Sequence, residues 1–249
     1  MYNPITGVFD RIEVRCPIRP LDVFEPFGGN GLSQVIHYAP RPRVNHLTAW
    51  ELDVRLAVQL KKNFPDTDVK VCNAFEEVNR LHPHFDVIIV DNNLLQWPNF
   101  EHFDLFPAIF KGLKDNAFMV ISVCHDPRGY FTVREHLVKA ALGSRTEDFV
   151  KDWDVARIKF YNMYDAGNFF YQDMVGHIRP TAIMSTNDMV PIYMNLALKA
   201  GFFTQYQTII PRSQWMKYIV LELQRGTPKA EREAKYKDKL ERQKAIDQS

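Results

Sequence analysis

The sequence contains little cysteine and almost no net charge. Its three cysteines, Cys16, Cys72 and Cys124, are far apart and form no CxxC pair. A disulfide framework or a structural zinc site is therefore not expected, no metal is predicted, and a reducing cytoplasm is the predicted location. The net charge of +1 excludes a global field that attracts nucleic acid, so such a partner would need a local basic patch.

Long apolar runs and internal repeats are also missing. No apolar run approaches the length of about 20 residues that a membrane-spanning helix needs, and residues 1–15 lack the apolar core of a signal peptide. A composition of 46% hydrophobic and 24% charged residues is typical of a soluble globular protein. The 249 residues are enough for one large α/β domain or two small ones.

The first half of the chain alternates short apolar runs with helical patterns. A helix is predicted from the N-cap Asp53 to about Phe64, and another over His102–Leu113. This alternation predicts an α/β fold with a mostly parallel sheet and helices on both faces. Its strands are predicted over Leu21–Phe24, His46–Glu51, Asp68–Cys72, Phe85–Asp91 and Ala117–Val123.

The second half is less regular. Residues 125–188 are rich in aromatics without a strand–helix repeat, and we interpret them as an inserted substrate-recognition cap within a domain of residues 1–225. A helix near Pro191–Ala200 that stops at Gly201 is then followed by an antiparallel hairpin, with strands at Phe202–Ile210 and Trp215–Leu223. Residues 226–249 form a charged tail, helical or disordered.

A glycine-rich turn is the most informative feature. The first strand runs into Glu25-Pro26-Phe27-Gly28-Gly29-Asn30-Gly31, and the next strand ends at Glu51. Such a turn lets backbone N–H groups approach a ligand, while a strand-end carboxylate can bind both hydroxyls of a ribose. The pair predicts a site for a nucleoside cofactor.

These motifs resemble those of the class I S-adenosylmethionine-dependent methyltransferases. The turn is similar to the family's (D/E)-x-x-x-G-x-G sequence, and Glu51-Leu52-Asp53 to its acidic second-strand end. Asn73-Ala74-Phe75-Glu76 stands where the family often has Asp-Ala, and Leu196–Phe202 resembles its step into the hairpin. The resemblance implies a Rossmann-like sheet of seven strands, an antiparallel hairpin and S-adenosylmethionine as cofactor.

The resemblance also implies roles for individual residues. Glu25 would orient the methionine part of the cofactor, Glu51 would accept both ribose hydroxyls, and Leu52 would pack on the adenine. Asn73 would meet the adenine edge, although it could instead satisfy a turn, and Asp53 is better explained as a helix cap. The implied cofactor-binding residues are Glu25, Phe27, Gly28, Gly29, Gly31, Glu51, Leu52, Asn73, Ala74 and Asp91.

Two residues are candidates for catalysis. Asp91 ends the fourth strand beside the expected position of the sulfonium methyl, and His125 directly follows the fifth strand. Either could act as a base if the acceptor must lose a proton. The alternatives are a helix cap for Asp91 and a hydrogen-bonded loop residue for His125.

The methyl acceptor is less well defined. The turn is closest to the D/E-P-F-x-G-x-G form common among enzymes that methylate nucleic-acid bases, which slightly favours a nucleic acid over a small molecule or peptide. However, Asp91-Asn92-Asn93-Leu94 lacks the prolines and aromatic of the (D/N/S)-P-P-(Y/F/W) motif of base-amine methylation. Scattered arginines are candidates for a basic rim: Arg11, Arg15, Arg19, Arg41 and Arg43.

Two other classes of protein compete with this interpretation. A nicotinamide-dependent oxidoreductase is disfavoured because the turn lacks a third glycine and Glu25 would place a negative charge near a pyrophosphate. A non-catalytic cofactor-binding scaffold or partner subunit stays open because of the unusual residues after Asp91.

Overall fold

The computed structural model describes residues 3–16, 19–91, 105–124, 186–212 and 216–226. Within these ranges, none of the helices is long and apolar enough to cross a membrane. The insertion predicted over 125–188 falls mostly outside these ranges, as do His125 and the tail beyond residue 226.

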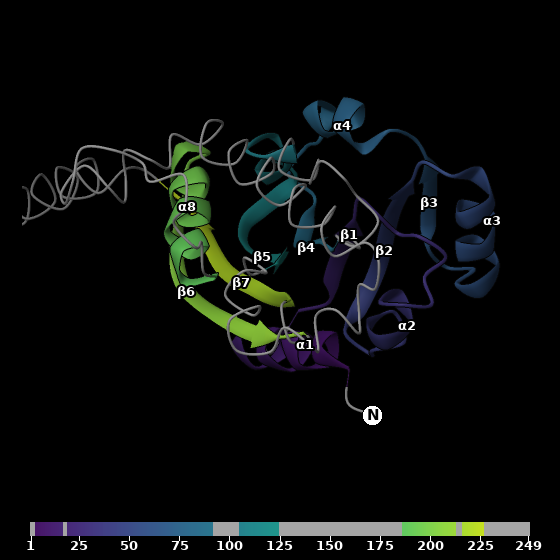
Figure 1. Ribbon diagram of the computed structural model, residues 1–249, viewed down its shortest axis with the longest axis horizontal. Helices are drawn as coiled ribbons and strands as arrows, with labels where there is room; N and C mark the ends of the chain where they lie inside the picture. The colour runs from purple at the N-terminus through teal and green to yellow at the C-terminus, as the bar shows by residue number, and fades with distance from the viewer. Residues whose placement is uncertain (1–2, 17–18, 92–104, 125–185, 213–215, 227–249) are drawn as a thin grey trace, which may run out of the picture.

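The elements alternate as the apolar pattern predicts (Figure 1). In chain order they are α1 (Pro4–Arg15), β1 (Leu21–Glu25), α2 (Val35–Tyr38), β2 (Val44–Glu51), α3 (Val54–Asn63), β3 (Asp68–Val71), α4 (Ala74–Glu77), η1 (Val78–Arg80), β4 (Phe85–Val90), η4 (Ala108–Gly112), β5 (Leu113–Cys124), α8 (Thr186–Lys199), β6 (Phe202–Pro211) and β7 (Met216–Arg225).

The strands form one seven-stranded sheet in the order β3-β2-β1-β4-β5-β7-β6. Strands β1 to β5 pair in parallel, and β7 runs antiparallel to both β5 and β6. The predicted Rossmann-like fold with a terminal antiparallel hairpin is therefore confirmed. Because these strands run parallel, the carboxyl ends of β1, β2 and β4 lie at one edge of the sheet. The strand order reverses beside β1, and ligands of open α/β sheets bind at the carboxyl edge next to such a reversal.

Two apolar layers cover the sheet, one on each face. One layer packs under α1, α2 and α3, with Phe9, Tyr38 and Leu60 among its buried residues. The other packs under α4, η4 and α8, around residues such as Phe110 and Tyr193. Strand β4 is buried along its full length, as its composition predicts.

Helix α1 is not predicted from the sequence. Its N-cap is Asn3, whose side-chain oxygen accepts a hydrogen bond from the backbone N–H of Ile5 at 3.0 Å, and Pro4 occupies the first turn. Buried residues at helical spacing fix the helix to the sheet: Ile5, Val8, Phe9 and Ile12. The Asn-Pro pair and this spacing are a sufficient local signal for the helix.

The helix predicted over His102–Leu113 is wrong for the part of the chain that the structure describes there. That part holds the 3₁₀ helix η4, and β5 already begins at Leu113. Pro107 explains the difference, since it has no N–H to donate and its ring obstructs the preceding helical turn. The later helix, α8, begins at Thr186 rather than near Pro191, and it ends before Gly201 as predicted.

Candidate functional site

The turn after β1 is tied to the end of β2. The N–H of Gly28 donates to the carbonyl of Trp50 at 2.9 Å, and a Cβ on Gly28 would lie 2.7 Å from Cδ2 of Leu60. Gly31 has a φ of +79°, and its Cβ would lie 2.6 Å from both Leu60 and Phe64. These two glycines are thus required by the close packing of the turn against α3.

Gly29 has a different environment. Its φ is +56°, and a Cβ there would meet nothing within 4 Å. Its N–H donates to Oε2 of Glu51 at 2.8 Å, and Oε1 of Glu51 accepts from the N–H of Asp53 at 2.9 Å. Both oxygens of Glu51 are therefore held by backbone donors at the end of β2. The next side chain, Leu52, is apolar and 69% exposed.

Asp53 and Asn73 act as helix caps. Asp53 accepts hydrogen bonds from the N–H groups of Arg55 and Leu56 at the start of α3, at 2.8 and 3.4 Å. Oδ1 of Asn73 accepts from the N–H of Phe75 at 3.1 Å, and its Nδ2 donates to Oε1 of Glu76 at 3.0 Å, so its side chain caps the start of α4. The structural alternatives for these two side chains are thus observed.

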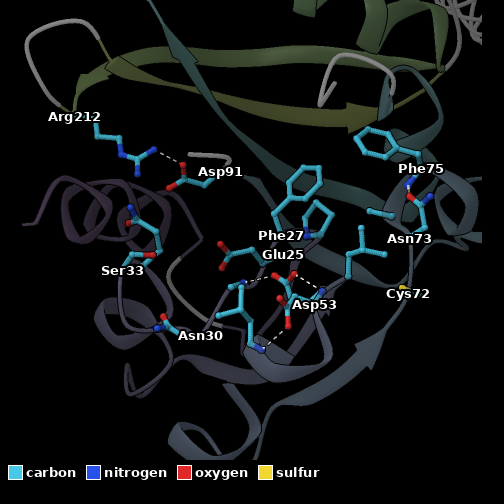
Figure 2. A pocket seen from close by; sticks show the side chains of 17 residues that line it. Glu25, Phe27, Asn30, Ser33, Asp53, Cys72, Asn73, Phe75, Asp91 and Arg212 are labelled. Atoms are coloured by element: carbon cyan, nitrogen blue, oxygen red, sulfur yellow. Dashed lines mark hydrogen bonds and ion pairs between the residues drawn. The ribbon is translucent and has the colours of Figure 1, made fainter. Parts of the chain in front are cut away.

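Glu25 is a buried carboxyl group at the end of β1. It is 2% exposed and accepts a hydrogen bond from the hydroxyl of Tyr38. Burial raises the pKa of Glu25 to about 8, and the nearby charge of Asp91 adds to the rise against the opposing effects of Tyr38 and Arg212. In Figure 2, Glu25 lies between Asp91 and Asp53.

Asp91 follows β4 and is also buried, but it has a cationic partner. Nη1 of Arg212 forms an ion pair with its Oδ1 (Figure 2), and the hydroxyl of Tyr218 donates to its Oδ2 at 2.7 Å. Arg212 also donates to Oγ of Ser122 at 3.0 Å. The pKa of Asp91 is raised above its ordinary value by burial, although Arg212, Tyr218 and Ser122 act to lower it. Because a guanidinium keeps its charge, a neutral Asp91 would leave that charge unpaired, so the ion pair with Arg212 favours the ionised form of Asp91 against the effect of burial.

These side chains line one cavity of about 780 Å³ at the carboxyl edge of the sheet, here called the carboxyl-edge cavity. Its volume suits a cofactor-sized ligand. Eight of the ten residues predicted to bind the cofactor line it: Glu25, Phe27, Gly29, Glu51, Leu52, Asn73, Ala74 and Asp91. Gly28 and Gly31 instead pack beneath the turn.

The cavity also contains residues that the sequence did not reveal as part of the site. Arg212 directly follows β6, and Gln34 follows the glycine turn; both line the cavity. The hydroxyl of Tyr38 donates a hydrogen bond to Glu25, and the hydroxyl of Tyr218 donates one to Asp91. The position of Arg212 at the tip of the predicted hairpin was an available signal, because that tip returns to the carboxyl edge of the sheet.

The predicted basic rim does not form a free patch. Arg41 pairs with Asp10 and Glu13, and its pKa is raised by the bond to Glu13. Three other arginines of the predicted rim are also bonded within the protein. Arg15 pairs with Glu222, Arg19 pairs with Asp86, and Arg43 donates to backbone carbonyls. Among the described residues, no group of three or more His, Cys, Asp or Glu side chains could hold a metal ion.

The fold is that of the class I S-adenosylmethionine-dependent methyltransferases. Magnesium protoporphyrin IX methyltransferase from Synechocystis PCC 6803, whose structure holds bound S-adenosylhomocysteine (SAH), is similar with a TM-score of 0.50. The likeness covers 89% of this chain and 82% of that one at 10% identity.

A possible exported protein from Bordetella parapertussis is similar with a TM-score of 0.51 and 13% identity, over 89% of this chain and 67% of that one. At such low identity these likenesses define the fold alone. No protein-family model matches the sequence, and no curated protein sequence matches it.

Proposed function

We propose that this protein transfers a methyl group from S-adenosylmethionine to an acceptor. The observation that carries the proposal is the carboxylate of Glu51, which the N–H groups of Gly29 and Asp53 hold at the wall of the carboxyl-edge cavity. Each carboxylate oxygen retains a lone pair beyond the backbone bond, so Glu51 can accept the two hydroxyls of a ribose.

The rest of the cavity suits the other parts of that cofactor. Leu52 offers an apolar face to an adenine beside the ribose site. Glu25 and Asp91 place carboxyl groups where the amino-acid part of the cofactor, with its α-ammonium, would lie. We assign the nucleoside to the Glu51 end and the amino acid to the Glu25 end.

Methyl transfer needs alignment more than covalent help from the protein. A positioned methyl and nucleophile at about 3 Å account for most of the rate enhancement in such displacements. Asp91 already forms an ion pair with Arg212, so accepting a proton from the acceptor would break that pair. This favours an orienting role for Asp91, and it leaves His125 as the proposed base for an acceptor that must be deprotonated.

We propose a nucleic acid as the acceptor ahead of a small molecule or peptide. The support for this choice is the Glu25–Gly31 motif. Four of the five arginines of the predicted rim are engaged within the protein and add no support: Arg15, Arg19, Arg41 and Arg43. Screening RNA, DNA and small-molecule pools with cofactor labelled in its methyl group tests the choice. Labelling of the small-molecule pool alone would contradict it.

Calorimetric titration with S-adenosylmethionine and with SAH tests the cofactor. We expect binding of both, weakened in Glu51→Ala by about 1.5–3 kcal/mol because charge-assisted hydrogen bonds to the ribose are lost. Asp115→Ala is the matched control, since it removes an exposed carboxylate on β5, outside the cavity lining, and should leave the affinity unchanged.

Three outcomes would contradict the proposal in different ways. Unchanged affinity in Glu51→Ala would remove Glu51 from the site. Binding of NADH, with none of S-adenosylmethionine, would favour the oxidoreductase. Cofactor binding without transfer to any acceptor pool would favour a scaffold.

A further inference from the structure

Within the described ranges, five ionisable groups act electrostatically on Glu25, and one of them is a cation. The cation, Arg212, is paired with Asp91. Among the residues that the structure describes, no Lys, Arg or His forms an ion pair with Glu25, whose hydrogen-bond donor is a neutral hydroxyl. The five groups are Tyr38 of α2, Glu51 at the end of β2, Asp91 after β4, Arg212 after β6 and Tyr218 of β7.

A second polar side chain in the same wall has an unsatisfied acceptor atom. Gln34 is 8% exposed and lines the carboxyl-edge cavity, and its Oε1 is buried without a hydrogen-bond partner. A buried acceptor of this kind is costly unless a ligand supplies the donor. Gln34 and Glu25 therefore offer two acceptors to a group that brings several N–H donors and a positive charge.

We propose that Glu25 is neutral in the empty cavity and ionises when the α-ammonium group of the cofactor enters, so that binding releases one proton. The proposal rests on the proposed function, because it takes S-adenosylmethionine as the ligand. The proton leaves the carboxyl of Glu25 for solvent, and the new carboxylate pairs with the ammonium.

The charge balance of the wall supports this assignment. With Asp91 and Arg212 as an ion pair, a neutral Glu25 leaves the methionine end of the empty cavity without net charge. Glu51 lies at the other end, where the ribose would bind. Ionising Glu25 without a ligand would place a second buried carboxylate beside Asp91 with no cation left to balance it. A ligand cation supplies the missing charge, so ionisation and binding occur together. Burial, which raises the pKa of Glu25 to about 8, keeps the group protonated at neutral pH until that moment.

Calorimetry in buffers of different ionisation enthalpy measures the released protons directly. At pH 6.5 the ligand's α-amino group, with an ordinary pKa of about 8, is already protonated in solution, so it contributes little to the count. We expect native protein to release close to one proton on binding S-adenosylmethionine or SAH. It should release none on binding 5′-methylthioadenosine, a neutral nucleoside without the amino-acid part.

Two variants test whether the released proton comes from Glu25 or from another group. Glu25→Gln keeps the shape and the acceptor for Tyr38 but has no proton to lose, so its release should fall to near zero. The affinity of native protein for S-adenosylmethionine should rise up to about tenfold from pH 6 to pH 7, while that of Glu25→Gln stays nearly flat. Glu51→Gln is the control at the ribose end. It should weaken the binding of all three ligands and leave the number of released protons close to the native value.

Arg212 provides a second, independent test. Arg212→Gln removes the cation that balances Asp91, so Asp91 also takes up a proton in the empty cavity. One ligand ammonium balances only one of the two carboxyls, so the variant should still release close to one proton. The double variant Glu25→Gln/Arg212→Gln should also release close to one proton, now from Asp91, whereas Glu25→Gln/Arg212→Lys, which keeps the charge, should release none. No release in Glu25→Gln/Arg212→Gln would overturn the role given to the Asp91–Arg212 pair.

The outcomes distinguish the two proposals. Binding of S-adenosylmethionine without proton release, or equal release by native protein and Glu25→Gln, overturns this inference alone. Failure of the native protein to bind either S-adenosylmethionine or SAH overturns the proposed function and this inference with it.

Discussion

The two edges of the sheet each hold a pair of acidic residues on strands β1 and β4. At the amino edge, Asp22 and Asp86 share Lys114, whose Nζ lies 2.6 and 2.8 Å from their carboxylates. Asp86 also pairs with Arg19 at 3.0 Å and accepts from the N–H of Asp22 at 2.9 Å. Two cations therefore balance two buried or half-buried carboxylates.

At the carboxyl edge, Glu25 and Asp91 occupy the other ends of the same strands and have a different balance. Arg212 pairs with Asp91, whereas Glu25 receives a hydrogen bond from Tyr38. Partial burial acts to raise the pKa of Asp22, but Lys114 outweighs it and the pKa of Asp22 is lowered; at Glu25 burial prevails and the pKa rises.

This difference in charge balance gives the two acidic pairs different roles: the pair at the amino edge contributes to stability, and the pair at the carboxyl edge to ligand binding. A buried carboxylate whose charge is balanced within the protein has no need of a ligand, and its removal destabilises the fold because its partners are left unpaired. One left unbalanced at a cavity wall costs stability until a ligand arrives, and such groups gather at functional sites. Mutations at the two edges should therefore have opposite effects on the free energy of unfolding.

The largest effect is expected at the amino edge. Asp86→Ala leaves Lys114 and the N–H of Asp22 without this partner, and Asp86 itself is fully buried. The free energy of unfolding should fall by about 4 kcal/mol, which urea titration measures. Asp86→Asn, which keeps an acceptor for Asp22, should lose less. A loss below about 1 kcal/mol in Asp86→Ala would show that the cluster is not structural.

The second effect is a gain in stability at the carboxyl edge. Between its ordinary pKa of 4.5 and the folded value of about 8, Glu25 holds a proton that the unfolded chain has released, so native stability falls as pH rises through this window. Glu25→Gln lacks this penalty and should be more stable than native protein by about 3 kcal/mol at pH 7.

The two proteins should be nearly equal at about pH 4, below the ordinary pKa, where Glu25 is largely protonated in both the folded and unfolded states. Urea titration at the two pH values measures the difference. A variant less stable than native protein at pH 7 would show that Glu25 is compensated like its counterparts at the amino edge.

The smallest effect is expected at Asp22. Its lowered pKa means that its ionised form stabilises the fold above the ordinary value of 3.8, and this contribution is lost as pH falls through the folded pKa. Asp22→Asn should therefore cost about 1 kcal/mol at pH 7 and nothing in strong acid. A difference from native protein that does not change with pH would contradict a charge effect.

Local patterns predicted much of the fold and part of the site. The glycine turn, the strand ending at Glu51 and the buried strand β4 follow from short segments of chain, and the structure brings them to one cavity. The same kind of reasoning was wrong over His102–Leu113, where helical spacing of apolar residues is overridden by Pro107. Helix α1 had a local signal at Asn3 and Pro4, which the prediction did not use.

Local patterns along the chain specify most of the strands and helices, the position of the glycine turn, and the carboxylate that ends β2. These depend on hydrogen bonds and apolar spacing between near neighbours. Long-range folding is what pairs Arg212 with Asp91, 121 residues away, and what buries Glu25 with no cation of its own among the described residues. Desolvation and ion pairing depend on which distant segments surround a group, so the charge state of the cavity is a property of the folded chain.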